Sequence, residues 1–382
     1  MKTVRIGIAG LGNMGSAHAR QILEDKIPRL ELTAVCDDDP EKLARFPQAK
    51  HYPGSAPMIR SGGIDAILIA TPHYSHTAIG IDALKHGLHV LVEKPVSVHK
   101  ADCQKLIAAH KNKRRIFAAM FNQRTDPFYI KIRDLVRGGS LGEIRRVNWI
   151  ITNWFRTDAY YASSAWRATW RGEGGGVLLN QCPHNLDLFQ WMFGMPKTVR
   201  GFCRIGHYHK IEVEDDVTAW FEFPNGASGV LITSTGEAPG TNRLEITGDL
   251  GRLVYENDAI EFIRNEVATS KFSRTSKESF ASPATHREQI AVQGHGGQHN
   301  AILENFTEAI LDGAKLIAPA KEGIHSVELA NAILLSSLEN KTIAFPMSAA
   351  AYKKKLDSLI KNSKFKKKTA KTGIADLSKS FK

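Results

Sequence analysis

Short apolar runs alternate with helical segments along the first third of the chain. The segments between the runs show helical periodicity, and the runs themselves occupy residues 4–9, 31–36, 65–70, 88–92 and 116–120. Strands separated by helices of this length predict a parallel sheet with right-handed crossovers. In such sheets ligands bind beyond the carboxyl ends of the strands, so the loops there are the first candidates for a site.

From residue 125 onward the pattern changes to consecutive strands joined by short turns. Strands are predicted at residues 143–154, 198–206, 216–223, 227–235 and 242–247. Pro224-Asn225-Gly226 is typical of a hairpin turn between two of them. The pattern predicts an open, mainly antiparallel sheet.

Less regular segments complete the second part of the chain. Residues 127–137 predict a helix, and the polar residues 264–294 show little periodicity and predict a long loop. Amphipathic helices are predicted at 300–311 and 326–339, and we expect both to pack back on the first domain.

Length and pattern together predict two domains and a tail. A chain of 382 residues is longer than one ordinary hydrophobic core supports. We expect an α/β domain over residues 1–124 and an α+β domain over residues 125–345. A C-terminal helix and a basic tail are expected over residues 346–382.

The composition is that of a soluble globular protein, with 42% hydrophobic and 24% charged residues. No apolar run reaches the length of about 18 residues that a membrane span requires. The N-terminus lacks the pattern of a signal peptide. The four cysteines are scattered, which favours a reducing compartment over a disulfide framework or a structural zinc. These features predict a cytoplasmic protein.

The net charge of +12 raises the question of nucleic-acid binding. Most of that charge lies at the end of the chain, because residues 353–382 contain eleven Lys and two Asp. This tail has few apolar residues and lacks the interleaved aromatic residues of single-strand binders. A solvated terminus is therefore favoured over a nucleic-acid interface.

A glycine-rich motif follows the first predicted strand. Its sequence, Gly-Leu-Gly-Asn-Met-Gly over residues 10–15, stands between a strand and a helix, the context that gives Gly-x-Gly-x-x-Gly its meaning. The first glycine permits a tight turn, the second lets the backbone approach a diphosphate, and the third lets the helix pack on the strand. The pattern predicts a Rossmann domain whose cofactor-binding residues include Gly10, Gly12, Asn13, Met14 and Gly15.

Asp37 indicates which dinucleotide is bound. It follows the second strand, about 20 residues beyond the glycine motif, where an acidic residue binds the ribose hydroxyls. Its carboxylate would repel a 2′-phosphate, and no Arg follows directly. NAD is therefore favoured over NADP; a nucleotide-free fold is the alternative.

Polar residues follow three of the later strands. The loops Thr71-Pro72-His73 with His76, Glu93-Lys94-Pro95 and Asn122-Gln123-Arg124 all lie at predicted strand ends. Lys94 has an ordinary pKa of about 10.4, too high for a general base. Burial and a neighbouring nicotinamide would lower that pKa toward about 7–8, the range useful in catalysis. The alternative is a surface lysine paired with Glu93.

Residues 174–187 contain a second candidate for proton transfer. Three glycines, 174–176, precede Asn180 and His184, which are spaced to share one face of a helical turn. A histidine at the head of a buried helix suits proton transfer. The alternative is that Asn180 caps the helix and His184 is hydrogen-bonded in the core.

The segment 152–171 is rich in aromatic residues and arginines, which suit the C–H faces and hydroxyl edges of sugars. Packing beneath a loop is the alternative for each ring. From the segments described so far, the substrate-binding residues expected are Asn122, Arg124, Trp154, Tyr160, Asn180 and Asp187. No metal site is expected, because His207 and His209 have no evident third ligand.

In combination these motifs resemble the Gfo/Idh/MocA oxidoreductases over about residues 3–345. The matching motifs are Gly10–Gly15, Thr71-Pro72-His73 with His76, Glu93-Lys94-Pro95, Trp166-Arg167, and Gly174–His184 with Asp187. The resemblance implies that Lys94 is the catalytic lysine and His184 the proton-transfer histidine. It also implies a cis peptide before Pro95 and cofactor contacts from Thr71, Pro72, His73, His76, Glu93, Lys94, Trp166 and Arg167.

One position departs from the inositol dehydrogenases of that family. They place an Asp four residues before the histidine, where this chain has Asn180. An amide binds hydroxyls but does not act as a carboxylate base. This difference weakens the inositol dehydrogenase assignment and gives more weight to Lys94 and His184.

The sequence therefore predicts an NAD-dependent oxidoreductase acting on a hydroxyl or keto group of a sugar, polyol or glycoside. One alternative is a redox-neutral enzyme that retains its NAD, such as a transient-oxidation glycosidase or an epimerase. A second is a non-catalytic sensor that binds a dinucleotide. The resemblance also implies a homodimer or homotetramer formed through the open sheet.

Overall fold

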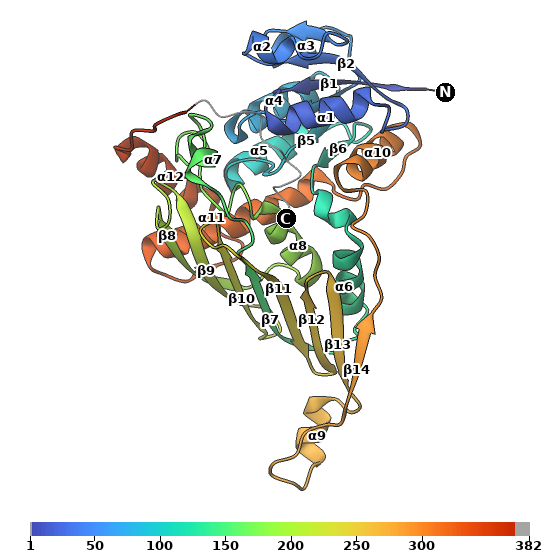
Figure 1. Cartoon of the computed structure of the whole chain (residues 1–382), viewed down its shortest axis with the longest axis vertical. Coiled ribbons are helices and arrows are strands. Elements are labelled where there is room, and N and C mark those ends of the chain that lie inside the picture. The colour runs from blue at the N-terminus through green and yellow to red at the C-terminus, as the bar shows by residue number, and fades with distance from the viewer. Residues whose placement is uncertain (1, 371–382) are drawn as a thin grey trace.

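A computed structural model describes residues 2–370 and contains two separate β-sheets (Figure 1). The first sheet has the order β3-β2-β1-β4-β5-β6, and all its pairings are parallel. Its strands are β1 (Val4–Ala9), β2 (Leu30–Cys36), β3 (Lys50–Tyr52), β4 (Ala66–Ile69), β5 (His89–Val92) and β6 (Phe117–Ala119). This is the Rossmann strand order, with the point of reversal between β1 and β4. The predicted parallel sheet is confirmed.

Helices connect these strands and cover the sheet. They are α1 (Asn13–Leu23), α2 (Pro40–Leu43), α3 (Ser55–Ile59), α4 (His73–Lys85) and α5 (Lys100–Ala109). Strands β4 and β5 are buried along their whole length, as expected when both faces of a parallel sheet are covered. Helix α4 begins at His73, so His73 and His76 lie in a helical turn and not in the predicted loop.

A later part of the chain contributes to the same core. Helix α10 (Gln298–Leu311) packs Ile302, Leu303 and Phe306 into it, as predicted for that helix. Beyond α10, the N–H of Ala119 in β6 donates to the carbonyl of Ala318 at 3.0 Å. The domain limits at residues 124 and 345 remain a prediction, because residues from both sides of residue 124 build this core.

The second sheet is mixed and has the order β14-β13-β12-β11-β7-β10-β9-β8-β15. Its strands are β7 (Ile144–Ile151), β8 (Thr198–Ile205), β9 (Glu214–Glu222), β10 (Ser228–Ser234), β11 (Asn242–Gly248), β12 (Gly251–Glu256), β13 (Ala259–Asn265), β14 (Thr285–Ile290) and β15 (Ile343–Ala344). All pairings are antiparallel except that of β7 with β10. The predicted mainly antiparallel sheet is confirmed.

The prediction of one long loop over residues 264–294 was wrong. The segment contains α9 (Thr269–Thr275), which projects from the body at the bottom of Figure 1, and the strand β14. Strand β14 is a polar edge strand with mostly exposed side chains, so no apolar alternation marked it.

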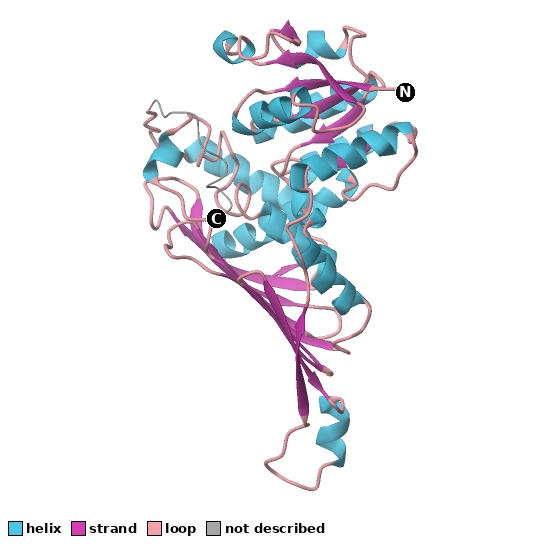
Figure 2. Cartoon of the chain, turned by 45° about the vertical axis from the view of Figure 1, so that its right-hand side comes forward, coloured by secondary structure: helices cyan, strands magenta, loops and turns pink. Residues whose placement is uncertain are grey.

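Helices cover one face of the second sheet, which crosses Figure 2 as a slanting band. They are α6 (Pro127–Arg137), α8 (Pro183–Phe193) and α11 (Gly323–Glu339). Helix α11 is buried in the core of this sheet, through residues such as Leu329 and Ile333. It also contacts α5 of the first domain, where Oδ1 of Asn331 accepts the N–H of Lys100 at 3.0 Å, so its predicted packing on that domain is confirmed. The remaining elements are α7 (Asp158–Ala162), α12 (Ala349–Asn362), η1 (Asn122–Thr125) and η2 (Ala320–Glu322).

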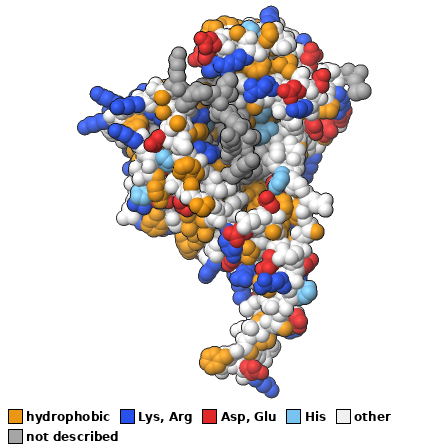
Figure 3. All heavy atoms as spheres, in the orientation of Figure 1, with side chains coloured by type: hydrophobic (Ala, Val, Ile, Leu, Met, Phe, Trp, Pro, Cys, Tyr) orange, Lys and Arg blue, Asp and Glu red, His pale blue; other side chains and the backbone are white. Residues whose placement is uncertain are grey.

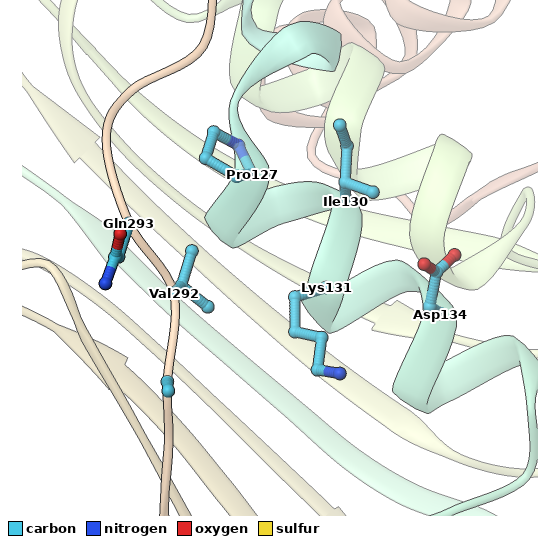
Figure 4. A pocket seen from close by; sticks show the side chains of 7 residues that line it. Pro127, Ile130, Lys131, Asp134, Val292 and Gln293 are labelled. Carbon is cyan, nitrogen blue, oxygen red and sulfur yellow. The ribbon is translucent and has the colours of Figure 1, made fainter.

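Two surface features lie outside the candidate site. Phe202, Ile205 and Trp220 are exposed on β8 and β9; the oligomer expected there remains a prediction. A surface pocket of about 290 Å³ lies between α6 and residues 291–293 and shares no residue with the candidate site (Figure 4).

Among residues 2–370, no helix is both long and apolar enough to cross a membrane. The predicted basic tail lies in part, from residue 371, outside the described residues.

Candidate active site

The glycine turn after β1 is shaped to hold a diphosphate. Gly10 has a φ of +91°, and a Cβ there would lie 2.8 Å from the carbonyl oxygen of Ala70. A Cβ on Gly15 would overlap the carbonyl oxygen of Gly10, whereas one on Gly12 meets no atom within 4 Å. Gly12 is also the N-cap of α1, which has no side-chain cap for its first N–H groups. An open backbone and uncapped N–H groups at a helix start fit the NAD diphosphate.

Asp37 lies beside this turn. Its Oδ2 accepts the N–H of Leu11 at 2.6 Å, and its Oδ1 accepts the N–H of Asp39 at 3.0 Å and Lys42 Nζ at 3.1 Å. Burial raises the pKa of Asp37, but these N–H donors outweigh that effect and leave the pKa below its ordinary value. The carboxylate is therefore ionised at the place where the second strand meets the glycine turn.

The residues that follow β4 lie at the carboxyl end of that strand. Thr71 Oγ1 is buried and has no hydrogen-bond partner within residues 2–370, so it is free to meet a ligand. Pro72 is the N-cap of α4. His76 lies between two backbone carbonyls, those of Thr71 at 2.8 Å and Pro95 at 2.9 Å. Two predicted cofactor loops, after β4 and after β5, are joined through this ring.

Glu93 is fixed in place at the end of β5. Its Oε1 lies 2.7 Å from Nε2 of His18 on α1, and its Oε2 accepts the N–H of Lys94 at 3.1 Å. Burial raises the pKa of Glu93, but the hydrogen bond and charge of His18 lower it to about 2. The peptide between Lys94 and Pro95 is cis, as the resemblance implied.

Lys94 joins the two halves of the site. Its Nζ donates to the carbonyl of Asn180 at 2.8 Å, across from β5 to the segment before α8. Burial lowers the pKa of Lys94; the charge of Glu93 opposes this change, and Arg156 and Arg167 add to it. The structure thus supplies the lowered lysine pKa that proton transfer requires.

His184 is buried in the first turn of α8. Burial, together with the charge of Lys94, lowers its pKa well below the ordinary value, so the imidazole is neutral. Its Nδ1 has no hydrogen-bond partner within the described residues. The edge of its ring faces Phe121, with 6.4 Å between the centroids. Nδ1 therefore gives no support to the alternative, in which His184 is hydrogen-bonded in the core.

Asn180 lies in the turn before the helix, and the structure corrects its predicted geometry. Helix α8 begins at Pro183, and its N-cap is Cys182 with no side-chain cap. Asn180 is therefore neither part of a helical face with His184 nor a cap. A proline suits the first helical position because it lacks an N–H, which explains where the helix starts.

The side chain of Asn180 is held by three others. Its Nδ2 donates to Oε1 of Glu173, and its Oδ1 accepts the hydroxyl of Tyr160 at 3.0 Å and Nε2 of Gln181 at 3.1 Å. Tyr160 in turn accepts Nη1 of Arg167 at 2.7 Å. Trp166 packs edge-on against His73, with 5.4 Å between the ring centroids. The aromatic segment is thereby connected both to Asn180 and to the loop after β4.

Arg124 and Asp187, predicted to bind substrate, pair with each other. Nε and Nη2 of Arg124 donate to the two oxygens of Asp187 at 2.6 and 2.7 Å, and Nη1 donates to Glu322 at 2.6 Å. Arg124 and Asp187 are 2% and 0% exposed. This pairing occupies both carboxylate oxygens, so it favours a structural role over the predicted contact with substrate.

We expect Asp187→Asn to destabilise the fold by about 3–5 kcal/mol, because it leaves the buried guanidinium with a single counter-charge, the partly exposed Glu322. Asp65→Asn is the matched control, since Asp65 pairs with Arg5 at the surface and its loss costs about 1 kcal/mol or less. Urea denaturation of both variants measures the difference. Equal losses in the two variants would contradict the structural role.

Asn122 and Trp154, the remaining predicted substrate residues, are both buried. Nδ2 of Asn122 donates to Gln298 at 2.7 Å, while its Oδ1 has no partner within residues 2–370. Trp154 donates its Nε1 to Asn185 at 3.3 Å. Asn122 thus keeps an acceptor for a ligand, whereas the ring of Trp154 packs in the core.

Sequence reasoning missed three members of the site. Glu173 bonds to Asn180, His18 bonds to Glu93, and the rings of His18 and His299 lie 5.5 Å apart. Glu173 directly precedes the three glycines, and His18 stands three residues after Gly15, so both lay beside motifs already recognised. His299 is distant in sequence, and no local pattern indicated its position.

Glu214 supports the glycine segment from β9. Its Oε1 accepts the N–H groups of Gly176 at 2.8 Å and Leu178 at 3.2 Å, and its Oε2 has no partner within the described residues. Burial raises its pKa from 4.5 to about 7. The folded state therefore binds a proton more tightly than the unfolded chain does.

This pKa makes stability depend on pH. Between about pH 4.5 and 7 the folded state holds more protons, so the free energy of unfolding falls as pH rises, by up to about 3 kcal/mol. Glu214→Gln should remove that part of the slope, and the exposed Glu266→Gln should leave it unchanged. Denaturation at several pH values measures both. A wild-type slope retained in Glu214→Gln would contradict the assignment.

The chain matches two profiles of one protein family. The profile of the oxidoreductase family with an NAD-binding Rossmann fold covers residues 4–121, and that of the GFO/IDH/MocA C-terminal domain covers residues 129–254. Together the two matched segments span more than half of the chain.

Individual proteins are also similar to this chain. It is 30% identical to the rhizopine catabolism protein MocA of Rhizobium meliloti over 52% of its own length, and the match spans only 60% of that relative. It is 25% identical to the scyllo-inositol 2-dehydrogenase (NADP⁺) IolW of Bacillus subtilis, over 89% of this chain and 96% of the relative.

A solved structure shares the fold. The WlbA dehydrogenase of Chromobacterium violaceum, crystallised with NADH and UDP-GlcNAcA, superposes with a TM-score of 0.78 at 23% identity, over 91% of this chain and 97% of that one. With the Rossmann strand order, the glycine turn and the two profile matches, the chain belongs to the GFO/IDH/MocA oxidoreductase family, with the family's NAD-binding Rossmann fold in its first third.

Proposed function

We propose that this protein is an NAD-dependent dehydrogenase that oxidises a hydroxyl group of a sugar, polyol or glycoside. The observation that carries the proposal is Lys94, whose Nζ is held on the carbonyl of Asn180 and whose pKa is lowered. It stands at the carboxyl end of β5, where ligands of Rossmann sheets bind. The names of two relatives, for rhizopine catabolism and scyllo-inositol oxidation, agree with this class of substrate.

The chain's own side chains would manage the proton. NAD, held by the glycine turn and Asp37, would supply the acceptor for the hydride of the substrate carbon. Lys94 in its neutral form takes the hydroxyl proton, and the neutral His184 accepts a hydrogen bond from the same or a neighbouring hydroxyl through a ring nitrogen. Asn180 and Tyr160 orient the substrate, and Asn122 offers its unpartnered Oδ1.

Asp37 supports NAD in preference to NADP. Its carboxylate is ionised and fixed by the N–H of Leu11, so a 2′-phosphate placed there would meet a negative charge. Lys42 lies 3.1 Å from the same carboxylate and partly offsets that charge. We expect NAD to be used better than NADP, and Asp37→Ser to narrow the difference.

Absorbance at the NADH band tests the function. Purified protein with added NAD is mixed with inositols, aldoses, sugar acids and glycosides, and the assay is repeated with NADP. Steady NADH formation with one class supports the dehydrogenase and names its substrate. A single-turnover rise that stops would favour a redox-neutral enzyme with retained NAD. Cofactor binding without any absorbance change across the panel would contradict the proposal.

A further inference from the structure

The C-terminal segment 363–370 is hydrogen-bonded to two places in the body of the protein. It follows α12, and its hydroxyl group at Ser363 donates to Oε2 of Glu212. At its other end the N–H of Ala370 donates to the carbonyl of Ala162, at the end of α7, at 3.0 Å. Figure 1 shows this segment running from α12 toward α7. Its two attachment points, Ala162 and Glu212, lie on either side of Arg167 in the sequence.

Only two side chains of this segment turn toward the body. Phe365 and Lys367 are half-buried, whereas Lys364, Lys366 and Lys368 are exposed. This alternation is that of an extended chain with one face against the protein. Lys and Arg side chains gather at the surface where α12 ends (Figure 3). Lys367 therefore differs from the other lysines of the tail.

Lys367 faces polar groups of the site without pairing with them. Burial lowers the pKa of Lys367; the charge of Glu173 opposes this change, that of Arg167 adds to it, and that of Glu212 opposes it. Within residues 2–370, Lys367 forms no hydrogen bond or ion pair. In the same part of the chain, the buried Nε of Arg167 has no acceptor. Lys367 and Arg167 are thus two neighbouring cationic side chains that retain unused hydrogen-bond donors.

The site around them carries an excess of positive charge. Lys94, Arg156, Arg167 and Lys367 are linked by their mutual electrostatic effects. The charge of Glu173 acts on both Lys94 and Lys367, and burial raises the pKa of this acid.

Two other acids lie nearby. Glu93 pairs with His18, whereas Glu212, which accepts the N–H of Trp170, keeps its charge near Lys367, so the four cations still outnumber the acids that face them. Clustered cations in a poorly solvated place repel one another, and a bound anion relieves that repulsion.

We propose that Lys367 and Arg167 bind an anionic group of the substrate, a carboxylate or a phosphate on the sugar or polyol. The inference rests on the proposed function and narrows its substrate class to acidic sugars or polyols. The guanidinium matches the geometry of either oxyanion, and the ammonium adds a second charge. The diphosphate of the cofactor is served separately, by the glycine turn at the start of α1.

Binding is measured by calorimetry on the full chain saturated with NAD. The ligands are neutral sugars and polyols, each paired with its carboxylate and its phosphate, such as D-glucose, D-gluconate and D-glucose 6-phosphate. We expect one anionic member to bind the wild type more tightly than its neutral partner. Lys367→Gln should weaken that anion about tenfold or more, the loss of one charge-assisted contact, and leave neutral ligands unchanged. The tighter of carboxylate and phosphate identifies the group.

Lys366→Gln is the matched control, because it makes the same change one residue away on an exposed side chain. It should bind as the wild type does, and Lys367→Arg should restore most of the affinity. Equal affinity for neutral and anionic ligands, or equal losses in the two glutamine variants, would overturn the inference. Oxidation of neutral ligands alone would support the proposed dehydrogenase function and contradict the anion site. Lys367-dependent anion binding without NADH formation would support the anion site and contradict the dehydrogenase function.

Discussion

Replacing Lys94 by methionine is expected to lower kcat/KM at least about 100-fold while leaving NAD binding intact. Methionine keeps most of the length of the side chain but has no group that accepts a proton. The cofactor cradle is built by the glycine turn and Asp37, neither of which touches the Lys94 ammonium. NADH formation on the best substrate gives kcat/KM, and calorimetric titration with NAD gives the dissociation constant.

Two further variants separate proton transfer from charge. Lys94→Arg retains a cation but has a pKa too high to accept the proton, so it should be nearly as inactive as Lys94→Met. Lys85→Met changes an exposed lysine at the end of α4 and should be fully active. Full activity in Lys94→Met, or recovery in Lys94→Arg, would rule out Lys94 as the base.

Substitution of Gly12 should weaken NAD binding without affecting folding, whereas substitution of Gly15 should destabilise the fold. Gly12→Val adds a side chain where no protein atom lies within 4 Å of the new Cβ, so the variant should fold with an unchanged Tm. The new side chain occupies the path of the diphosphate and should weaken NAD binding about 100-fold or more, the loss of two charge-assisted hydrogen bonds. Gly15→Ala instead overlaps the backbone of Gly10 and should destabilise the fold by about 3 kcal/mol or more.

Gly54→Ala is the control for both variants. Gly54 is likewise an N-cap in open space, before α3, and it takes no part in the glycine turn. It should change neither Tm nor NAD affinity. Tight NAD binding by Gly12→Val would show that the diphosphate does not lie on this turn.

The central strands of the first sheet were predictable because they are buried on both faces, whereas the edge strand β3, with Lys50 and His51 exposed, was not predicted. Runs such as 66–69 and 90–92 are apolar throughout, and helical periodicity separates them. The outer part of the second sheet was not predictable in this way. Strand β14 pairs with β13 through its backbone and exposes most of its side chains, so nothing in its composition distinguishes it from a loop.

The candidate site was predictable where its residues follow a strand or a glycine motif. Lys94 and His184 belong to such motifs, and the structure joins their segments through the carbonyl of Asn180. The partner of Asn180, Glu173, depends on how the turn before α8 folds back, which local pattern does not record. Likewise the pairing of Arg124 with Asp187 joins residues far apart in sequence.

The lysine-rich end of the chain shows a different limit of sequence reasoning. Its composition describes all its lysines alike, as residues of a solvated terminus. The contacts of Ser363 and Ala370 orient the segment and turn Lys367 inward, so one lysine differs from its neighbours only by register. Composition does not show which lysines of an extended segment face the protein.

Helix α10 has a consequence for how the protein is made on the ribosome. The apolar side chains Ile302, Leu303 and Phe306 complete the core of a sheet whose last strand ends at Ala119. At roughly 5–20 residues per second, that sheet leaves the exit tunnel many seconds before the helix that seals it. The nascent nucleotide-binding half therefore exposes apolar surface to solvent during translation. A truncated gene ending near residue 124 should yield an aggregating product.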